Sequence, residues 1–164
     1  MELILTIMAN DRPGIAERLA AVIEAQQGNW LESRMATMSG KFAGIVRVAV
    51  PDNSFETTQK ALQGLRDEGL SVQIELGDAV QEDTSSQCVE VVGNDRAGIV
   101  REVTQALASC SINVIDLQTE IEPASMSGGS LFRAKIEFAL KAEQSMDTVV
   151  TALEALSPDL MVDY

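Results

Sequence analysis

The sequence predicts an α+β protein made of two tandem βαββαβ units, each an antiparallel sheet with both helices on one face. The expected order strand, helix, strand, strand, helix, strand occurs twice. The segment Asn10–Ile15 (NDRPGI) returns as Asn94–Ile99 (NDRAGI), at an offset of 84 residues (from 10 to 94). With 164 residues, the chain can bury its cores without disulfides or metals.

The first half begins with an apolar strand over residues 2–8, followed by the NDRPGI junction. Pro13 is expected in the first helical turn, with Asn10 or Asp11 capping the helix. Helical spacing then places apolar residues on one stripe, and Gly28 is expected to stop the helix. These apolar residues are Ile15, Leu19, Val22 and Ile23.

A hairpin is expected next, with strands at 30–38 and 42–50 around a tight turn at Ser39-Gly40. A second helix is expected from Phe55 to Leu65, ended by Gly69. A strand with clear alternation of apolar and polar residues follows at 70–76.

The polar and acidic segment 79–86 is expected to be a linker between domains 1–78 and 87–164. The second half repeats the pattern, and its loop at 122–130 is longer than the first hairpin turn. For that loop we favour a flexible surface over a lid or a partner contact. The expected elements are strands at 88–92, 115–121, 132–138 and 160–162, and helices at 99–107 and 146–156.

Composition excludes several classes of function. The net charge is −13, with −4 over residues 1–78 and −9 over 79–164, which disfavours direct nucleic-acid or membrane binding. Histidine is absent, so a Ser-His-Asp triad and imidazole metal sites are excluded, and we expect no metal and no cofactor. We interpret Cys88 and Cys110 as small buried thiols. The sequence shows no secretory signal, so the expected location is cytoplasmic.

A unit of this kind leaves one sheet face without helices. Apolar residues on that face, such as Trp30 or its neighbours, would need a cover. We therefore expect either a homo-oligomer or pairing of the two halves within the chain.

The repeated junction has the chemistry of a small-molecule contact. A helix start offers free amides and a dipole that favours an anionic group such as a carboxylate. Asp11 and Asp95 could accept hydrogen bonds from an ammonium group, and the glycines let a ligand approach the backbone. Plain helix capping is the structural alternative, and both interpretations stay open.

The junction resembles the signature of the ACT domain, a small βαββαβ ligand-sensing module. The resemblance rests on the DRPGI segment with Asn29, and on Asp95, Arg96, Gly98, Ile99 and Asn113, where Ala97 replaces the proline. The tandem arrangement is similar to the glycine cleavage system transcriptional repressor family. That family acts through a protein partner, a DNA-binding activator, rather than on DNA.

The resemblance implies a non-enzymatic, amino-acid-responsive regulator, with glycine as a candidate ligand. ACT domains bind amino acids at interfaces between paired domains. The alternatives are a structural interaction module without a ligand and an enzyme-associated regulatory subunit. The implied ligand-binding residues are Asn10, Asp11, Gly14, Ile15 and Asn29, and Asn94, Asp95, Gly98, Ile99 and Asn113.

Overall fold

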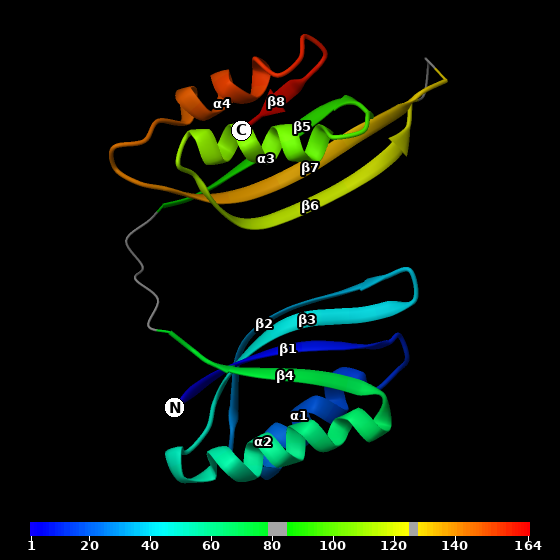
Figure 1. The fold of residues 1–164 in the computed structure, drawn as a ribbon, viewed down its shortest axis with the longest axis vertical. Helices are drawn as coiled ribbons and strands as arrows, with labels where there is room; N and C mark the ends of the chain where they lie inside the picture. Colours follow the sequence, from blue (N-terminus) through cyan, green and yellow to red (C-terminus); the bar gives the residue numbers. More distant parts are fainter. Residues whose placement is uncertain (79–84, 125–127) are drawn as a thin grey trace. The chain divides into compact units, whose positions relative to one another are not determined.

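The structure is a computed structural model, and it describes residues 1–78, 85–124 and 128–164. The chain divides into two compact units, Met1–Val80 and Gln81–Tyr164. Each unit has the order βαββαβ and one four-stranded antiparallel sheet (Figure 1). The predicted α+β fold of two tandem ferredoxin-like units is therefore confirmed.

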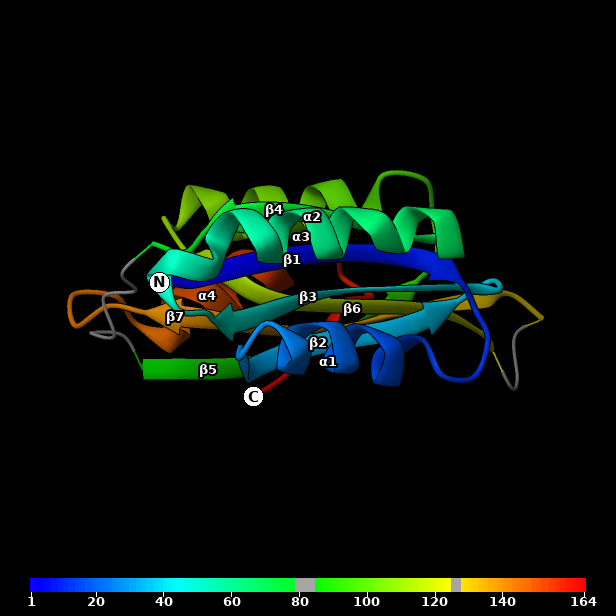
Figure 2. The same cartoon turned by 90° about the horizontal axis from the view of Figure 1, so that it is seen from below.

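In the first unit both helices cover one face of the sheet, and Figure 2 looks onto this helical side. The strand order is β2-β3-β1-β4, with antiparallel neighbours throughout. The expected hairpin turn is confirmed, since both Ser39 (φ 47°) and Gly40 (φ 76°) are left-handed, as a tight hairpin turn requires. The elements are β1 (Glu2–Asn10), α1 (Ile15–Ala25), β2 (Asn29–Met38), β3 (Lys41–Ala49), η1 (Asp52–Ser54), α2 (Phe55–Gly64), η2 (Leu65–Glu68) and β4 (Leu70–Leu76).

The second unit repeats this topology with the strand order β6-β7-β5-β8. Strand β5 begins at Ser85, inside the expected linker, and residues 79–84 lie outside the described residues. The expected loop 122–130 is shorter than predicted because both hairpin strands extend into it. Flexibility was expected for this whole loop, and its residues 125–127 lie outside the residues that the structure describes. The elements are β5 (Ser85–Asn94), α3 (Ile99–Ser109), β6 (Asn113–Pro123), β7 (Ser130–Leu140), α4 (Met146–Glu154) and β8 (Met161–Asp163).

Each unit has its own core between the sheet and its helices. Alternate residues of β1 point at the helices, so Leu3, Leu5 and Ile7 are fully buried against Leu19 and Ile23. In the second unit the side chain of Phe138, on β7, is completely buried. Burial of each such side chain contributes roughly 1.5–3 kcal/mol. These cores fix the position of the loops that join β1 to α1 and β5 to α3.

The end of α1 differs from the expectation for Gly28. The left-handed residue is Gln27 (φ 59°), and the amides of Gln27 and Gly28 donate to the carbonyls of Glu24 and Ile23. This is the Schellman arrangement. A Cβ on Gly28 would lie 2.8 Å from Cγ2 of Ile23, so close packing, and not the sign of φ, requires glycine there.

Trp30 does not lie on the helix-free face, contrary to the expectation. A β-bulge between Trp30 and Glu32 reverses the alternation, and Trp30 packs against the core. Cys88 is another correction, because it is exposed on β5 and not buried. Within the described residues, no helix is long and apolar enough to cross a membrane.

Candidate functional site

The candidate loop of each unit ends in a glycine with a left-handed backbone. Gly14 has φ 88° and Gly98 has φ 89°, and each immediately precedes its helix. No atom lies within 4 Å of a Cβ placed on either residue. Glycine is therefore required by the backbone conformation and not by packing inside the unit.

The predicted capping is wrong in both units. Pro13 lies in the turn before α1, which begins only at Ile15. In the described part of the chain, no side chain caps the start of α1 or α3. The first helical amides thus lie at a helix start whose dipole favours an anionic group.

Three contacts anchor the loop of the first unit. The amide of Asp11 donates to the carbonyl of Gly40 (2.9 Å). The guanidinium of Arg12 donates to the carbonyl of Glu68 at the end of η2 (2.6 Å), and Lys41 donates to the side-chain oxygen of Asn10. Both Asn10 and Arg12 therefore already have structural roles inside the unit.

The side-chain carboxylate of Glu68 also accepts hydrogen bonds from Arg18 of α1. Nε and Nη2 of Arg18 lie 2.7 and 2.6 Å from the two carboxylate oxygens. These hydrogen bonds lower the pKa of Glu68 and raise the pKa of Arg18. Sequence reasoning missed this pair, because nothing local in the sequence links residues so far apart.

The loop of the second unit is anchored differently. Arg96 makes two 2.6 Å hydrogen bonds to the carboxylate of Glu102, one turn into α3. The backbone amide of Asp95 donates to the carbonyl of Ser130, and the backbone amide of Asn94 donates to the carboxylate of Asp159, each at 2.9 Å. Hydrogen bonds from Ser157 and from the Asn94 amide lower the pKa of Asp159.

An exchange of charge at one repeat position explains the difference. Glu102 occupies the place of Arg18 at the 84-residue offset. The carboxylate in the second unit pairs with Arg96 of its own loop, and this hydrogen bond lowers the pKa of Glu102. In the first unit the arginine instead pairs with Glu68, before the last strand of the sheet.

A pocket of about 350 Å³ lies at the start of α3, between the loop and strand β6. It brings together three predicted site residues, Asp95, Gly98 and Ile99. Side chains of both charge signs line it. The remaining lining residues are Arg96, Val100, Thr119, Glu120, Ile121 and Phe132.

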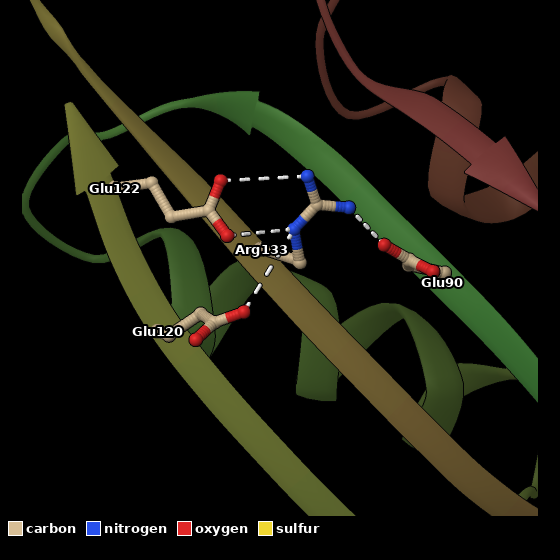
Figure 3. A network of polar contacts seen from close by, with 4 residues as sticks. All are labelled: Glu90, Glu120, Glu122 and Arg133. Carbon is tan, nitrogen blue, oxygen red and sulfur yellow. Dashed lines mark hydrogen bonds and ion pairs between the residues drawn. The ribbon is translucent and has the colours of Figure 1, made fainter. Parts of the chain in front are cut away.

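Glu120 of this pocket also belongs to an ionic network centred on Arg133 of β7 (Figure 3). Arg133 hydrogen-bonds Glu122 of β6 (3.1 Å) and Glu90 of β5. Its guanidinium lowers the pKa of Glu122. The carboxylate of Glu120 therefore points to Arg133 on the helix-free face, away from the start of α3.

Asn29 and Asn113 lie far from the loops of their own units. Asn10 of β1 pairs with Lys41 of β3, whereas Asn29 of β2 pairs with Ala49 at the far end of the same strand. Eight residues of strand separate these positions, about 26 Å. Asn94 and Asn113 are separated in the same way along β7, opposite Leu131 and Ala139. One unit therefore cannot place both asparagines on one small ligand.

The described residues contain no group of three or more Cys, Asp or Glu side chains placed to hold a metal ion. The polar groups at the loops are hydrogen-bond donors and acceptors for an organic ligand. Their chemistry fits a small zwitterion better than it fits a metal.

Residues 2–76 match the family model of the ACT domain. The protein is an ACT-domain protein. The match covers nearly all of the first unit, and the second unit repeats its topology to give a tandem ACT architecture. A comparison with curated proteins found no match.

Two solved structures extend the likeness to the whole chain. A protein of unknown function from Galdieria sulphuraria is 30% identical, with a TM-score of 0.85. A candidate glycine cleavage system transcriptional repressor is 17% identical, with a TM-score of 0.74, which shows the shared fold. In both cases the alignment covers 99% of this chain and 95% of the other chain.

Proposed function

We propose that this tandem ACT protein is a non-enzymatic regulator that binds a small amino acid. The observation that carries the proposal is the pocket at the start of α3, formed by the repeated motif. Its volume of about 350 Å³ is at the lower end of the range for ligand pockets, roughly 300–1,000 Å³, which favours a small ligand.

The pocket has complementary groups for both charges of an amino acid. A ligand carboxylate would be stabilised by the amides and dipole at the start of α3 and by Arg96. A ligand ammonium would be held by the carboxylate of Asp95. Gly98 leaves open space beside the backbone.

The regulatory step would use two states of the protein. An amino acid that binds one arrangement better than the other shifts the population toward it and so changes affinity for a partner. We propose glycine as the first ligand to test and a DNA-binding activator protein as the partner. Asn29 and Asn113 would then contribute by meeting a loop of another ACT unit.

Thermal unfolding with a panel of amino acids tests the sensing role. Ligand at 100-fold above its dissociation constant stabilises by about 2.7 kcal/mol, a shift of roughly 5–10 °C. Asp95→Asn should remove most of this shift, and Asp11→Asn is the matched change in the first unit. If no amino acid shifts the unfolding temperature at millimolar concentration, the sensing role is wrong.

A structural module without a ligand is the second candidate, and the first unit carries its evidence. Arg12 and Asn10 there are bound to Glu68 and Lys41, so the loop is tied down by its own unit. This candidate predicts that Asp95→Asn changes stability only and that no amino acid binds.

A further inference from the structure

The pocket at the start of α3 has one wall made of apolar side chains. Val100 and Ile121 line it while 41% and 61% of their surfaces stay exposed, and Phe132 lines it from the core. We call these three residues the apolar wall. Large apolar side chains that are exposed inside a pocket can be covered by an apolar group of a ligand.

Strand pairing places this wall on the same side of the sheet as α3. Ile121 and Thr119 of β6 pair with Phe132 and Ala134 of β7, which are both buried under the helices. Paired side chains share one face, so Ile121 and Thr119 also point to the helical side. Because β6 is the outer strand of the sheet (Figure 1), Ile121 stays exposed beyond the core.

The first unit has smaller or more polar side chains at the same places. At the 84-residue offset, Ala16 stands at the position of Val100 and Thr37 at the position of Ile121. Thr37 pairs with Phe42 as Ile121 pairs with its own phenylalanine, so the two positions correspond in the structure as well. The apolar wall is therefore a property of the second unit and not of the fold.

The polar side of the pocket is rich in carboxylates. Asp95 lines it, and Arg96 of the lining already donates two hydrogen bonds to Glu102. These hydrogen bonds and the nearby charge of Asp159 raise the pKa of Arg96. A second carboxylate, on the side chain of a ligand, would be repelled by the acidic groups around it. The surroundings therefore favour a ligand whose side chain is uncharged.

We infer that the ligand is an amino acid with an aliphatic side chain, such as valine, whose methyl groups pack on Val100 and Ile121. This inference rests on the amino-acid site proposed above and specifies which amino acids that site accepts. The charged groups of the ligand lie at Asp95 and the start of α3, and its side chain lies on the apolar wall. Each methylene group removed from water strengthens binding roughly fourfold, so valine should bind about tenfold or more tightly than glycine.

Calorimetric titration of the full chain with glycine, alanine, valine and aspartate tests the inference. Affinity should rise from glycine through alanine to valine, and aspartate should bind most weakly. If glycine or aspartate binds as tightly as valine, the inference is overturned while the proposed sensing function stands. If none of the amino acids binds, both are wrong.

The first unit supplies the substitutions that test the apolar wall. The double variant Val100→Ala, Ile121→Thr carries the side chains of the first unit and replaces exposed residues only, so it should fold, which circular dichroism checks. Its affinity for valine should fall about tenfold, with that for glycine unchanged. Ile45→Thr is the matched control, because Ile45 is a 55% exposed isoleucine of β3, and it should change neither affinity. Wild-type affinity for valine in a folded double variant overturns the inference.

Nuclear Overhauser contacts between the methyl protons of bound valine and those of Ile121 test the placement directly. We expect such contacts, together with contacts to Val100. Saturable binding of valine without them contradicts the inference. If the double variant instead changes the sedimentation of the chain and leaves the affinity for valine unaltered, the apolar wall is a contact with another protein and the inference is wrong.

Discussion

Arg18 donates two hydrogen bonds to the carboxylate of Glu68, fifty residues further along the chain. The pair joins helix α1 to the turn before β4, and Arg12 adds a hydrogen bond to the carbonyl of the same glutamate. In the second unit Arg96, which corresponds to Arg12, binds Glu102 of helix α3. One repeated motif is therefore held by two different ionic arrangements.

The Arg18–Glu68 pair predicts how the stability of the first unit depends on pH. The pKa of Glu68 is lowered in the folded state, so its contribution is fully present above the unfolded pKa of about 4.3. That contribution is lost as the pH falls through the lower folded pKa. Denaturant unfolding of wild type and Glu68→Gln should therefore show a stability difference at neutral pH that disappears in acid.

The control for this prediction is Arg18→Gln. Because the two residues act as a pair, the double variant should lose less stability than the sum of the single variants. Additive losses would show that the hydrogen bonds do not couple the residues in solution.

Gly14→Ala and Gly98→Ala should each destabilise their unit by about 1–2 kcal/mol, since alanine is strained at these positive φ values. Gly64→Ala is the matched control. Gly64 ends α2 with φ −61°, and no atom lies within 4 Å of an added Cβ. That change should stabilise by roughly 0.5–1 kcal/mol. Chemical unfolding measures all three, and equal effects would contradict the backbone explanation.

Arg133→Gln should raise the pKa of Glu122. The guanidinium of Arg133 holds that pKa below its usual value through a hydrogen bond. Carboxyl chemical shifts followed by NMR during an acid titration measure the change. The pKa of Glu68, in the other unit, serves as the internal control and should not move.

Phe138→Ala should destabilise the second unit by about 3–5 kcal/mol, because the ring is fully buried and its removal leaves a cavity. Hydrogen exchange of the β7 amides reports the loss directly. Protection of the β7 amides equal to that of the wild type would show that the core does not depend on this ring.

Local patterns were sufficient to predict most of the fold. The apolar run at residues 2–8 predicted strand β1, and the repeated motif predicted two equivalent units. Trp30 was assigned to the wrong face because the bulge between Trp30 and Glu32 inserts one extra residue. The alternation before the bulge is therefore out of step with the alternation after it. A bulge of this kind leaves no signal in a single sequence.

The site was predicted only in part, for a similar physical reason. Asp95, Gly98 and Ile99 share a pocket because they are close in sequence and lie on one loop and helix start. Glu120 and Phe132 reach the same pocket through strand pairing, which depends on long-range register. The anchors Glu68 and Asp159 were missed because they lie 56 and 65 residues along the chain from Arg12 and Asn94, so that only the tertiary fold brings them together.

NMR titration of the full chain with glycine, and then with other small amino acids, tests the central claim most directly. Amino-acid sensing predicts saturable shifts of backbone amides at the start of α3, concentrated at Asp95, Gly98 and Ile99 and absent in Asp95→Asn. If every amino acid leaves these amides unperturbed at millimolar concentration, the proposed sensing function is contradicted.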